Sequence, residues 1–124
     1  MRFATEENFT KVYGLFKKNH DLLPHIRMGY VTRKIKDRRC IFSEGVVIIF
    51  EIYEKSVQVG MNTKSETSDC HINQIVSTDR DGSASRVLNQ FFDFIALLPY
   101  TSGVIYLNVK TDNDRAKKFY ERME

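Results

Sequence analysis

The chain has 124 residues, of which 42% are hydrophobic and 28% are charged, values typical of one folded domain with a single core. We therefore predict a single domain over residues 1–124 and exclude a second domain, a disordered chain and a fibrous protein. The 19 Lys and Arg residues against 16 Asp and Glu give a net charge of +3. This charge is too small to indicate, by itself, nucleic acid as the main partner.

The sequence carries no signal for a membrane or for secretion. No run approaches the roughly 18 apolar residues of a membrane span, and the N-terminus turns acidic at Glu6 and Glu7 without an apolar segment. The cysteines Cys40 and Cys70 have neither CxxC spacing nor a histidine pair at ligand distance, so we interpret them as buried thiols. These features predict a cytoplasmic protein without a metal site.

The first third of the chain is expected to form a short strand at residues 1–4 and two helices. Thr5 is a favourable N-cap for a helix that runs to about Asn19 with apolar residues at helical spacing. Pro24 suits the first turn of a second helix that ends near Lys36.

The middle of the chain changes to an extended pattern. Residues 40–53 are rich in Val, Ile and aromatic residues around a Ser43-Glu44-Gly45 turn, which predicts an antiparallel hairpin. We expect residues 57–61 to extend the same meander, residues 62–69 to form a loop and residues 70–76 to form another strand.

The last third predicts a helix, a strand and a helix. Residues 83–98 have apolar positions at helical spacing before Pro99. Residues 104–109 are almost continuously apolar, as in a strand buried on both faces, and residues 113–123 again have a helical stripe. A strand, helix and strand in this order require a parallel pair with a right-handed crossover. The predicted fold class is therefore α/β: a mixed sheet with an antiparallel meander, then a parallel strand-helix-strand-helix unit, with helices on both faces.

A glycine-bearing turn lies between residues 72–77 and the helix that follows. Gly82-Ser83-Ala84-Ser85 opens this helix, and a helix N-terminus directs several backbone N–H groups at one point, which suits a phosphate. The signal is weak alone, because Gly82 also fits an ordinary tight turn.

A second motif is more specific. The segment DNDRAKKFYER, residues 112–122, directly follows the strand predicted at residues 104–109. It resembles the last motif of the GNAT superfamily of N-acetyltransferases, in which a strand is followed by Asn, Ala three residues later, Phe-Tyr-Glu and a basic residue. Gly82-Ser83-Ala84 lies where that family has its glycine-rich loop, and the resemblance covers roughly residues 40–123.

The resemblance implies a GNAT-like fold in which the strands at residues 72–77 and 104–109 splay apart and bind acetyl-CoA between them. The reaction implied is transfer of the acetyl group to a primary amine of an unknown acceptor. Tyr120 is then the candidate general acid for the departing thiolate; outside the motif it would be read as a core tyrosine. The residues implied in cofactor binding are Ile75, Val76, Ser77, Arg80, Gly82, Ser83, Ala84, Ser85, Arg86, Asn113, Ala116 and Tyr120.

The general base and the acceptor are less well defined. Glu51, Glu54, Asp69 and His71 lie on or beside the central strands, and His71 is best tuned at neutral pH; a structural histidine and a water relay remain as alternatives. The family's first two helices line the acceptor site. Most basic residues there fit an ordinary solvated face, but if they line the site they favour an anionic acceptor. These residues are Lys17, Lys18, His20, His25, Arg27, Arg33, Lys34, Lys36, Arg38 and Arg39.

Two features depart from the family. Asp79 replaces the loop's first Gln or Arg, although Arg80 and Arg86 supply charge nearby, and the family's last two strands are absent. We expect either a longer natural chain or another chain, such as a second copy in a homodimer, to complete the sheet edge at residues 104–109. The alternatives to an enzyme are a catalytically inactive GNAT-like binding or regulatory protein and a basic nucleic-acid-binding module.

Overall fold

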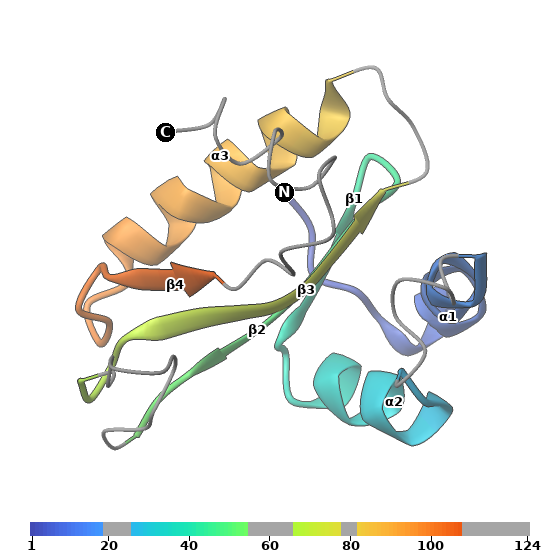
Figure 1. The fold of residues 1–124 in the computed structure, drawn as a ribbon, viewed down its shortest axis with the longest axis horizontal. Helices are drawn as coiled ribbons and strands as arrows, with labels where there is room; N and C mark the ends of the chain where they lie inside the picture. Colours follow the sequence, from blue (N-terminus) through green and yellow to red (C-terminus); the bar gives the residue numbers. More distant parts are fainter. Residues whose placement is uncertain (19–25, 55–65, 78–81, 108–124) are drawn as a thin grey trace.

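The architecture is a mixed four-stranded sheet with helices on both faces (Figure 1). A computed structural model describes residues 1–18, 26–54, 66–77 and 82–107. The strands lie in the order β1-β2-β3-β4; the β1–β2 and β2–β3 pairs are antiparallel, and β4 is parallel to β3. Their bounds are Cys40–Ser43 for β1, Val46–Ile52 for β2, Cys70–Ser77 for β3 and Ile105–Leu107 for β4. The predicted α/β class, the meander and the parallel pair are confirmed.

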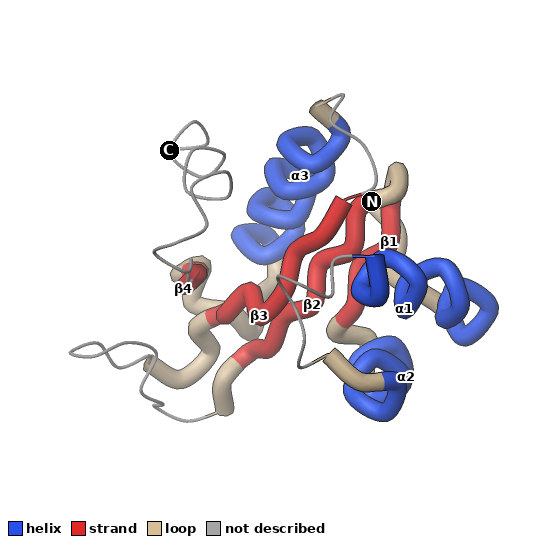
Figure 2. Tube along the Cα trace, turned by 45° about the vertical axis from the view of Figure 1, so that its right-hand side comes forward, coloured by secondary structure: helices blue, strands red, loops and turns tan. Residues whose placement is uncertain are grey.

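Helices α1 and α2 cover one face of the sheet and α3 covers the other (Figure 2). A 3-10 turn at Glu6–Asn8 leads into α1. The helices run over Phe9–Lys18 (α1), Met28–Lys36 (α2) and Ser83–Leu97 (α3). In the part of the chain that the structure describes, no helix is long and apolar enough to cross a membrane.

The strands alternate between two cores because successive side chains point to opposite faces. Val47 and Ile49 pack with α1 and α2, whereas Ile48 and Phe50 pack with α3. Phe50 meets Phe91 of α3 edge to face, with ring centroids 4.9 Å apart. The thiols of Cys40 and Cys70 are buried as predicted, and burial raises the pKa of each to about 12.

Local signals in the sequence explain two of the connections. Glu44 and Gly45 have φ values of 50° and 75°, the positive pair that a two-residue type I′ hairpin turn requires. The backbone N–H and the hydroxyl of Thr5 both donate to Oδ1 of Asn8, at 2.8 and 3.0 Å. Thr5 therefore starts the first helical segment as predicted.

The N-terminal strand and the start of the second helix differ from the prediction. The segment at residues 1–4 forms a single antiparallel bridge between Phe3 and Ile41 rather than a strand. Helix α2 begins at Met28, after an extended Arg27, and ends at Lys36 as expected. The predicted start at Pro24 and the predicted elements at residues 57–61 and 113–123 lie outside the described residues.

The expectation that the strand at residues 104–109 is buried on both faces is wrong for its described part. Ile105, Tyr106 and Leu107 are only half-buried, and Val104 is 46% exposed. The physical reason is position: β4 is the outermost described strand beside β3. Pairing of this edge with another chain stays a prediction.

Candidate functional site

A bulge in the middle of β3 shapes the candidate site. Ile49 of β2 pairs with Gln74 and the next residue, Phe50, pairs with Ile72, so Asn73 is an extra residue in the ladder. An extra residue bends the strand and resets which side chains share a face. Asn73 and Gln74 therefore lie on the same face as His71, toward α2, and line one cavity with it.

The described part of β4 pairs with the N-terminal half of β3. The pairing joins Cys70, His71 and Ile72 to residues 105–107, and β3 itself continues to Ser77. In Figure 1 the C-terminal half of β3 runs in a different direction from β4. A bend of β3 is the geometry expected from an extra residue in the strand.

The N-terminus of α3 follows the end of β3 after residues 78–81. Gly82 occupies the N-cap with a φ of +93°, and no side chain caps this end by a hydrogen bond among the described residues. The first helical hydrogen bond runs from the Arg86 N–H to the Gly82 carbonyl at 3.1 Å. First-turn N–H groups have no partner within a helix and carry its positive dipole end. The predicted loop residues Gly82, Ser83, Ala84, Ser85 and Arg86 form the N-cap and first turn of α3; their role in cofactor binding stays a prediction.

Two side chains in this first turn have roles that the sequence did not reveal. Ser83 is 2% exposed, so its side chain faces the interior. The Arg86 guanidinium lies 3.1 Å from the Glu44 carboxylate, and both are exposed. This ion pair ties the start of α3 to the β1–β2 turn.

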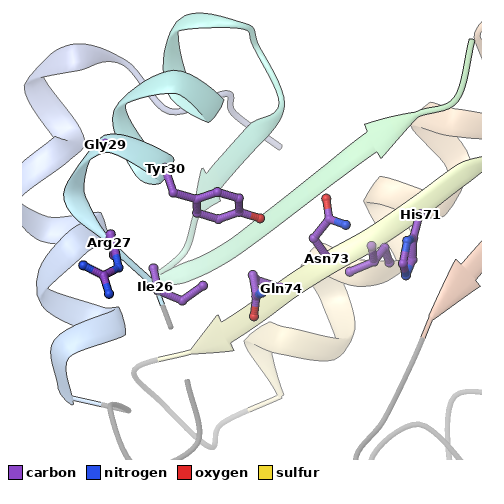
Figure 3. A pocket seen from close by; sticks show the side chains of 8 residues that line it. Ile26, Arg27, Gly29, Tyr30, His71, Asn73 and Gln74 are labelled. Carbon is purple, nitrogen blue, oxygen red and sulfur yellow. The ribbon is translucent and has the colours of Figure 1, made fainter. Parts of the chain in front are cut away.

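A cavity of about 510 Å³ lies between the N-terminal turn of α2 and β3 (Figure 3). Its size falls within the range of roughly 300–1,000 Å³ typical of small-molecule sites. The residues that line it are Ile26, Arg27, Gly29, Tyr30, His71, Ile72, Asn73 and Gln74. It lies on the face of the sheet covered by α1 and α2.

His71 belongs to a polar cluster that borders this cavity. Its Nδ1 is 2.6 Å from the Tyr53 hydroxyl and 3.9 Å from a carboxylate oxygen of Glu51, its partner across the β2–β3 ladder. The Asn73 amide donates to the same Glu51 oxygen at 3.2 Å. Side-chain exposure is 14% for His71 and 40% for Glu51, so the histidine is held inside while the carboxylate reaches solvent.

The ionisation of this cluster follows from burial and from Glu51. Burial lowers the pKa of His71, and the Glu51 charge acts in the opposite direction. Burial, together with the charge and hydrogen bond of Glu51, raises the pKa of Tyr53 to about 12. At neutral pH the phenol therefore keeps its proton, and His71 favours the neutral imidazole.

The Tyr53 hydroxyl and Nδ1 of His71 share one hydrogen bond, and its direction follows the tautomer of the histidine.

Tyr30 forms the wall of the cavity opposite β3. Burial and the Glu51 charge raise the pKa of Tyr30 to about 12, although a hydrogen bond from Gln74 acts against them. The Lys34 ammonium lies 5.8 Å from the Tyr30 ring centroid. Tyr30 is thus a neutral phenol with a cation stacked on its ring.

The structure brings only part of the predicted site together. Among the cofactor-binding candidates on β3, Val76 is buried toward α1 and α2, Ile75 packs toward α3, and Ser77 ends the strand half-buried. The candidates outside the described residues are Arg80, Asn113, Ala116 and Tyr120.

Of the base candidates, His71 lines the cavity and Glu51 stands behind it. Asp69 does not line the cavity; it is buried in the turn before β3, where it accepts a hydrogen bond from Ser102. Glu54 is exposed after the end of β2.

The basic residues of the first two helices that the structure describes have different surroundings. Arg27 lines the cavity, and Lys34 stacks on its Tyr30 wall. Arg38 and Arg39 instead stack on the rings of Phe3 and Phe50. His20 and His25 lie outside the described residues.

Sequence reasoning missed Tyr30, Tyr53, Asn73 and Gln74. The available signal was weak: polar residues interrupt the apolar strand at residues 70–77. Only the bulge places two consecutive residues, Asn73 and Gln74, at one cavity.

Comparison with known proteins supports the fold. No protein-family model matches the chain, and no curated protein sequence matches it. A solved structure of a tetramutant of the BH1408 protein from Bacillus halodurans is similar, with a TM-score of 0.69 and 14% identity over 98% of this chain and 90% of that chain. A single-site mutant of the same protein gives a TM-score of 0.61 and 14% identity over 98% of this chain and 89% of that chain. At this identity the similarity shows a shared fold.

Proposed function

We propose that this protein is a GNAT-like N-acetyltransferase that moves an acetyl group from acetyl-CoA to a primary amine. One observation carries the proposal: β3 has a parallel neighbour, β4, and leads toward the glycine-initiated N-terminus of α3. This arrangement matches the parallel strand pair and the phosphate-binding turn that the resemblance at residues 112–122 implies. The cavity at His71 lies on the face where the resemblance places the acceptor.

The N-terminus of α3 fits the pyrophosphate of acetyl-CoA. Among the described residues, the nearest atom to a Cβ added at Gly82 would be an Arg86 guanidinium nitrogen at 4.0 Å, so none of them crowds this backbone. The first turn contains no acidic residue, and its N–H groups and dipole favour an anion. Arg86 would add a guanidinium by sharing it between Glu44 and a phosphate oxygen.

Bound acetyl-CoA supplies an activated thioester, and the chain's own residues prepare the acceptor amine. The neutral imidazole of His71 accepts the proton that the amine must lose. Tyr53 holds the imidazole through Nδ1, and Glu51 stabilises the imidazolium once the proton has arrived. Holding the amine in this cavity provides the orientation on which much of the rate depends.

The second candidate is a catalytically inactive binding or regulatory protein on the same scaffold, contacting nucleic acid. The observation that favours it is the charge of α2, whose last turn contains Arg33, Lys34 and Lys36. Such a protein need not turn over acetyl-CoA. Retained binding of nucleic acid without thiol release from acetyl-CoA would support this candidate.

The first experiment is thermal unfolding with acetyl-CoA, because a ligand bound only by the native state stabilises it by about 2.7 kcal/mol at 100 times its Kd. Gly82→Glu should remove this stabilisation by placing bulk and negative charge at the α3 N-terminus. Gly103→Glu is the matched control, since Gly103 also has a positive φ, of +83°, and no described residue within 4 Å of an added Cβ. Equal acetyl-CoA binding by wild type and Gly82→Glu would reject the placement of the pyrophosphate.

The second experiment follows thiol release from acetyl-CoA with a panel of primary amines. His71→Gln should bind acetyl-CoA normally and slow transfer by about 100-fold or more, the usual contribution of a general base. Normal turnover in this variant would show that His71 is a structural residue and not the general base. Acetyl-CoA binding without turnover of any amine would favour the inactive binding protein.

A further inference from the structure

We infer that the acceptor is a small zwitterionic amine, with its amino group at His71 and an oxyanion, carboxylate or phosphate, at Arg27. The inference rests on the proposed function and narrows its substrate class. The cavity between α2 and β3 carries opposite electrostatic character at its two ends, and Figure 3 shows Arg27 at one end and His71 at the other, with Tyr30 and Gln74 between them.

The α2 end of the cavity favours an anion. Arg27 is the exposed N-cap residue, and no side-chain hydrogen bond caps this helix end in the described part of the chain. Residues 26–36 contain four basic residues and no acidic one. Lys34, stacked on Tyr30, adds a second positive charge beside the cavity.

Gly29 has no side chain that could cover the backbone in the first turn of α2. It lines the cavity, and a Cβ added there would meet no atom of the described residues within 4 Å. A ligand can therefore approach the N–H groups at the positive end of the α2 dipole. Together with the Arg27 guanidinium, which can bind a carboxylate or phosphate through two N–H groups, this end suits an oxyanion.

The β3 end favours a nitrogen that donates hydrogen bonds. The Asn73 amide nitrogen donates a hydrogen bond to Glu51, so the oxygen of the same amide points away from Glu51. That oxygen, Oδ1, is buried and has no hydrogen-bond partner among the described residues, and such an acceptor costs free energy until a donor reaches it. An amino group is such a donor, and the negative charge of Glu51 attracts it as an ammonium before His71 takes its proton.

The two ends together exclude other acceptors. A lysine-rich peptide would bring further positive charge to Arg27 and Lys34, and a neutral amine would leave the cationic end without a partner. The volume of about 510 Å³ suits one small molecule. A compact molecule with both charges matches the cavity at each end.

The test compares matched acceptors in the thiol-release assay: free amino acids, the amines that lack their carboxylate, aminophosphonates of equal length and a lysine-rich peptide. We expect kcat/KM for at least one amino acid or aminophosphonate to exceed that of its decarboxylated amine by about 10- to 100-fold, the effect of one charge-assisted interaction. The two anionic series separate a carboxylate site from a phosphate site. Equal or faster turnover of simple amines or of the peptide would overturn the inference.

Arg27 provides the matched variants. Arg27→Gln should raise KM for the preferred zwitterion by about 10-fold or more and leave KM for its decarboxylated amine unchanged. Arg33→Gln removes the same charge from an exposed position at the other end of α2 and should leave both values unchanged. Equal effects of the two variants would show that Arg27 acts only through the net charge of the protein. This result would overturn the assignment of Arg27 to the oxyanion of the acceptor.

A binding measurement separates this inference from the proposed function. Titration of the preferred zwitterion without acetyl-CoA should shift the imidazole resonances of His71 in wild type and not in Arg27→Gln. This shift is expected even if the protein transfers no acetyl group. No shift at His71 for any zwitterion would overturn the inference, whereas failure of acetyl-CoA to bind would reject the proposed function alone.

Discussion

Replacement of Asp69 by Asn tests how the turn before β3 holds the start of β4. Asp69 is 2% exposed, and its carboxylate accepts hydrogen bonds from the Glu66 N–H, at 2.8 Å, and from the Ser102 hydroxyl. Tyr106 of β4 donates a further side-chain hydrogen bond to it. The Ser102 oxygen in turn accepts the Val104 N–H at 3.2 Å. One carboxylate thus joins the turn to the residues that begin β4.

The magnitude follows from what an amide can accept. Asn has one oxygen where Asp69 has two, so at least one donor faces an NH₂ group in either orientation. Losing one hydrogen bond to a charged group costs about 1.5–3 kcal/mol, and those that remain become weaker without the charge. We expect Asp69→Asn to lower the free energy of unfolding by about 2–4 kcal/mol, a large part of the roughly 5–15 kcal/mol of a typical domain.

The effect must depend on pH with a definite sign. Burial by itself would raise the pKa of Asp69, but the hydrogen bonds from Ser102, the Glu66 N–H and Tyr106 outweigh it and lower the pKa. A carboxyl with a lowered folded-state pKa stabilises the protein fully above its unfolded pKa of about 3.9 and loses this contribution as the pH falls through the folded value. The difference between wild type and Asp69→Asn should therefore be constant near neutrality and shrink in acid.

Urea unfolding followed by circular dichroism at several pH values measures this difference. Asp93→Asn, at an exposed position of α3, is the control and should change stability by no more than about 0.5 kcal/mol. A wild-type urea midpoint in Asp69→Asn would refute the reasoning. A stability difference that stays constant down to about pH 3 would show that the Asp69 charge is not its source.

Two further perturbations test the polar cluster and the core. Glu51→Gln should lower the pKa of His71 further, since the Glu51 charge raises it, and an NMR titration that moves upward or stays unchanged would contradict this electrostatic coupling. Phe91→Ala should cost about 3–5 kcal/mol in chemical unfolding, because Phe91 is fully buried against Phe50; Leu97→Ala, at a side chain 83% exposed, is the control, and similar losses in both would contradict the assigned core.

Sequence pattern alone predicts the parts of this fold that local chemistry controls. The β1–β2 hairpin follows from β-branched residues around a turn in which Gly45 adopts a positive φ. Helix α3 follows from apolar residues at helical spacing before Pro99, and it ends at Leu97. The strand-helix-strand order likewise predicts the parallel pair of β3 and β4, because a helical crossover joins parallel strands.

The candidate site depends on relations between segments that no local pattern contains. The sequence indicates His71 as a candidate base because an imidazole titrates near neutral pH. Glu51 and Tyr53 become its partners only through the register of β2 against β3. The burial of β4 depends on which strands lie beside it. An apolar run in the sequence therefore cannot predict that β4 is only half-buried.

The bulge at Asn73 is the clearest case. Strict alternation along residues 70–77 would place His71 and Gln74 on opposite faces of the sheet, yet both line one cavity. The sequence by itself determined that these residues form a strand and that polar side chains interrupt it. Only the tertiary structure decided where one residue of β3 is left out of the ladder, because that choice depends on how Ile49 and Phe50 pack into separate cores on the two faces of the sheet.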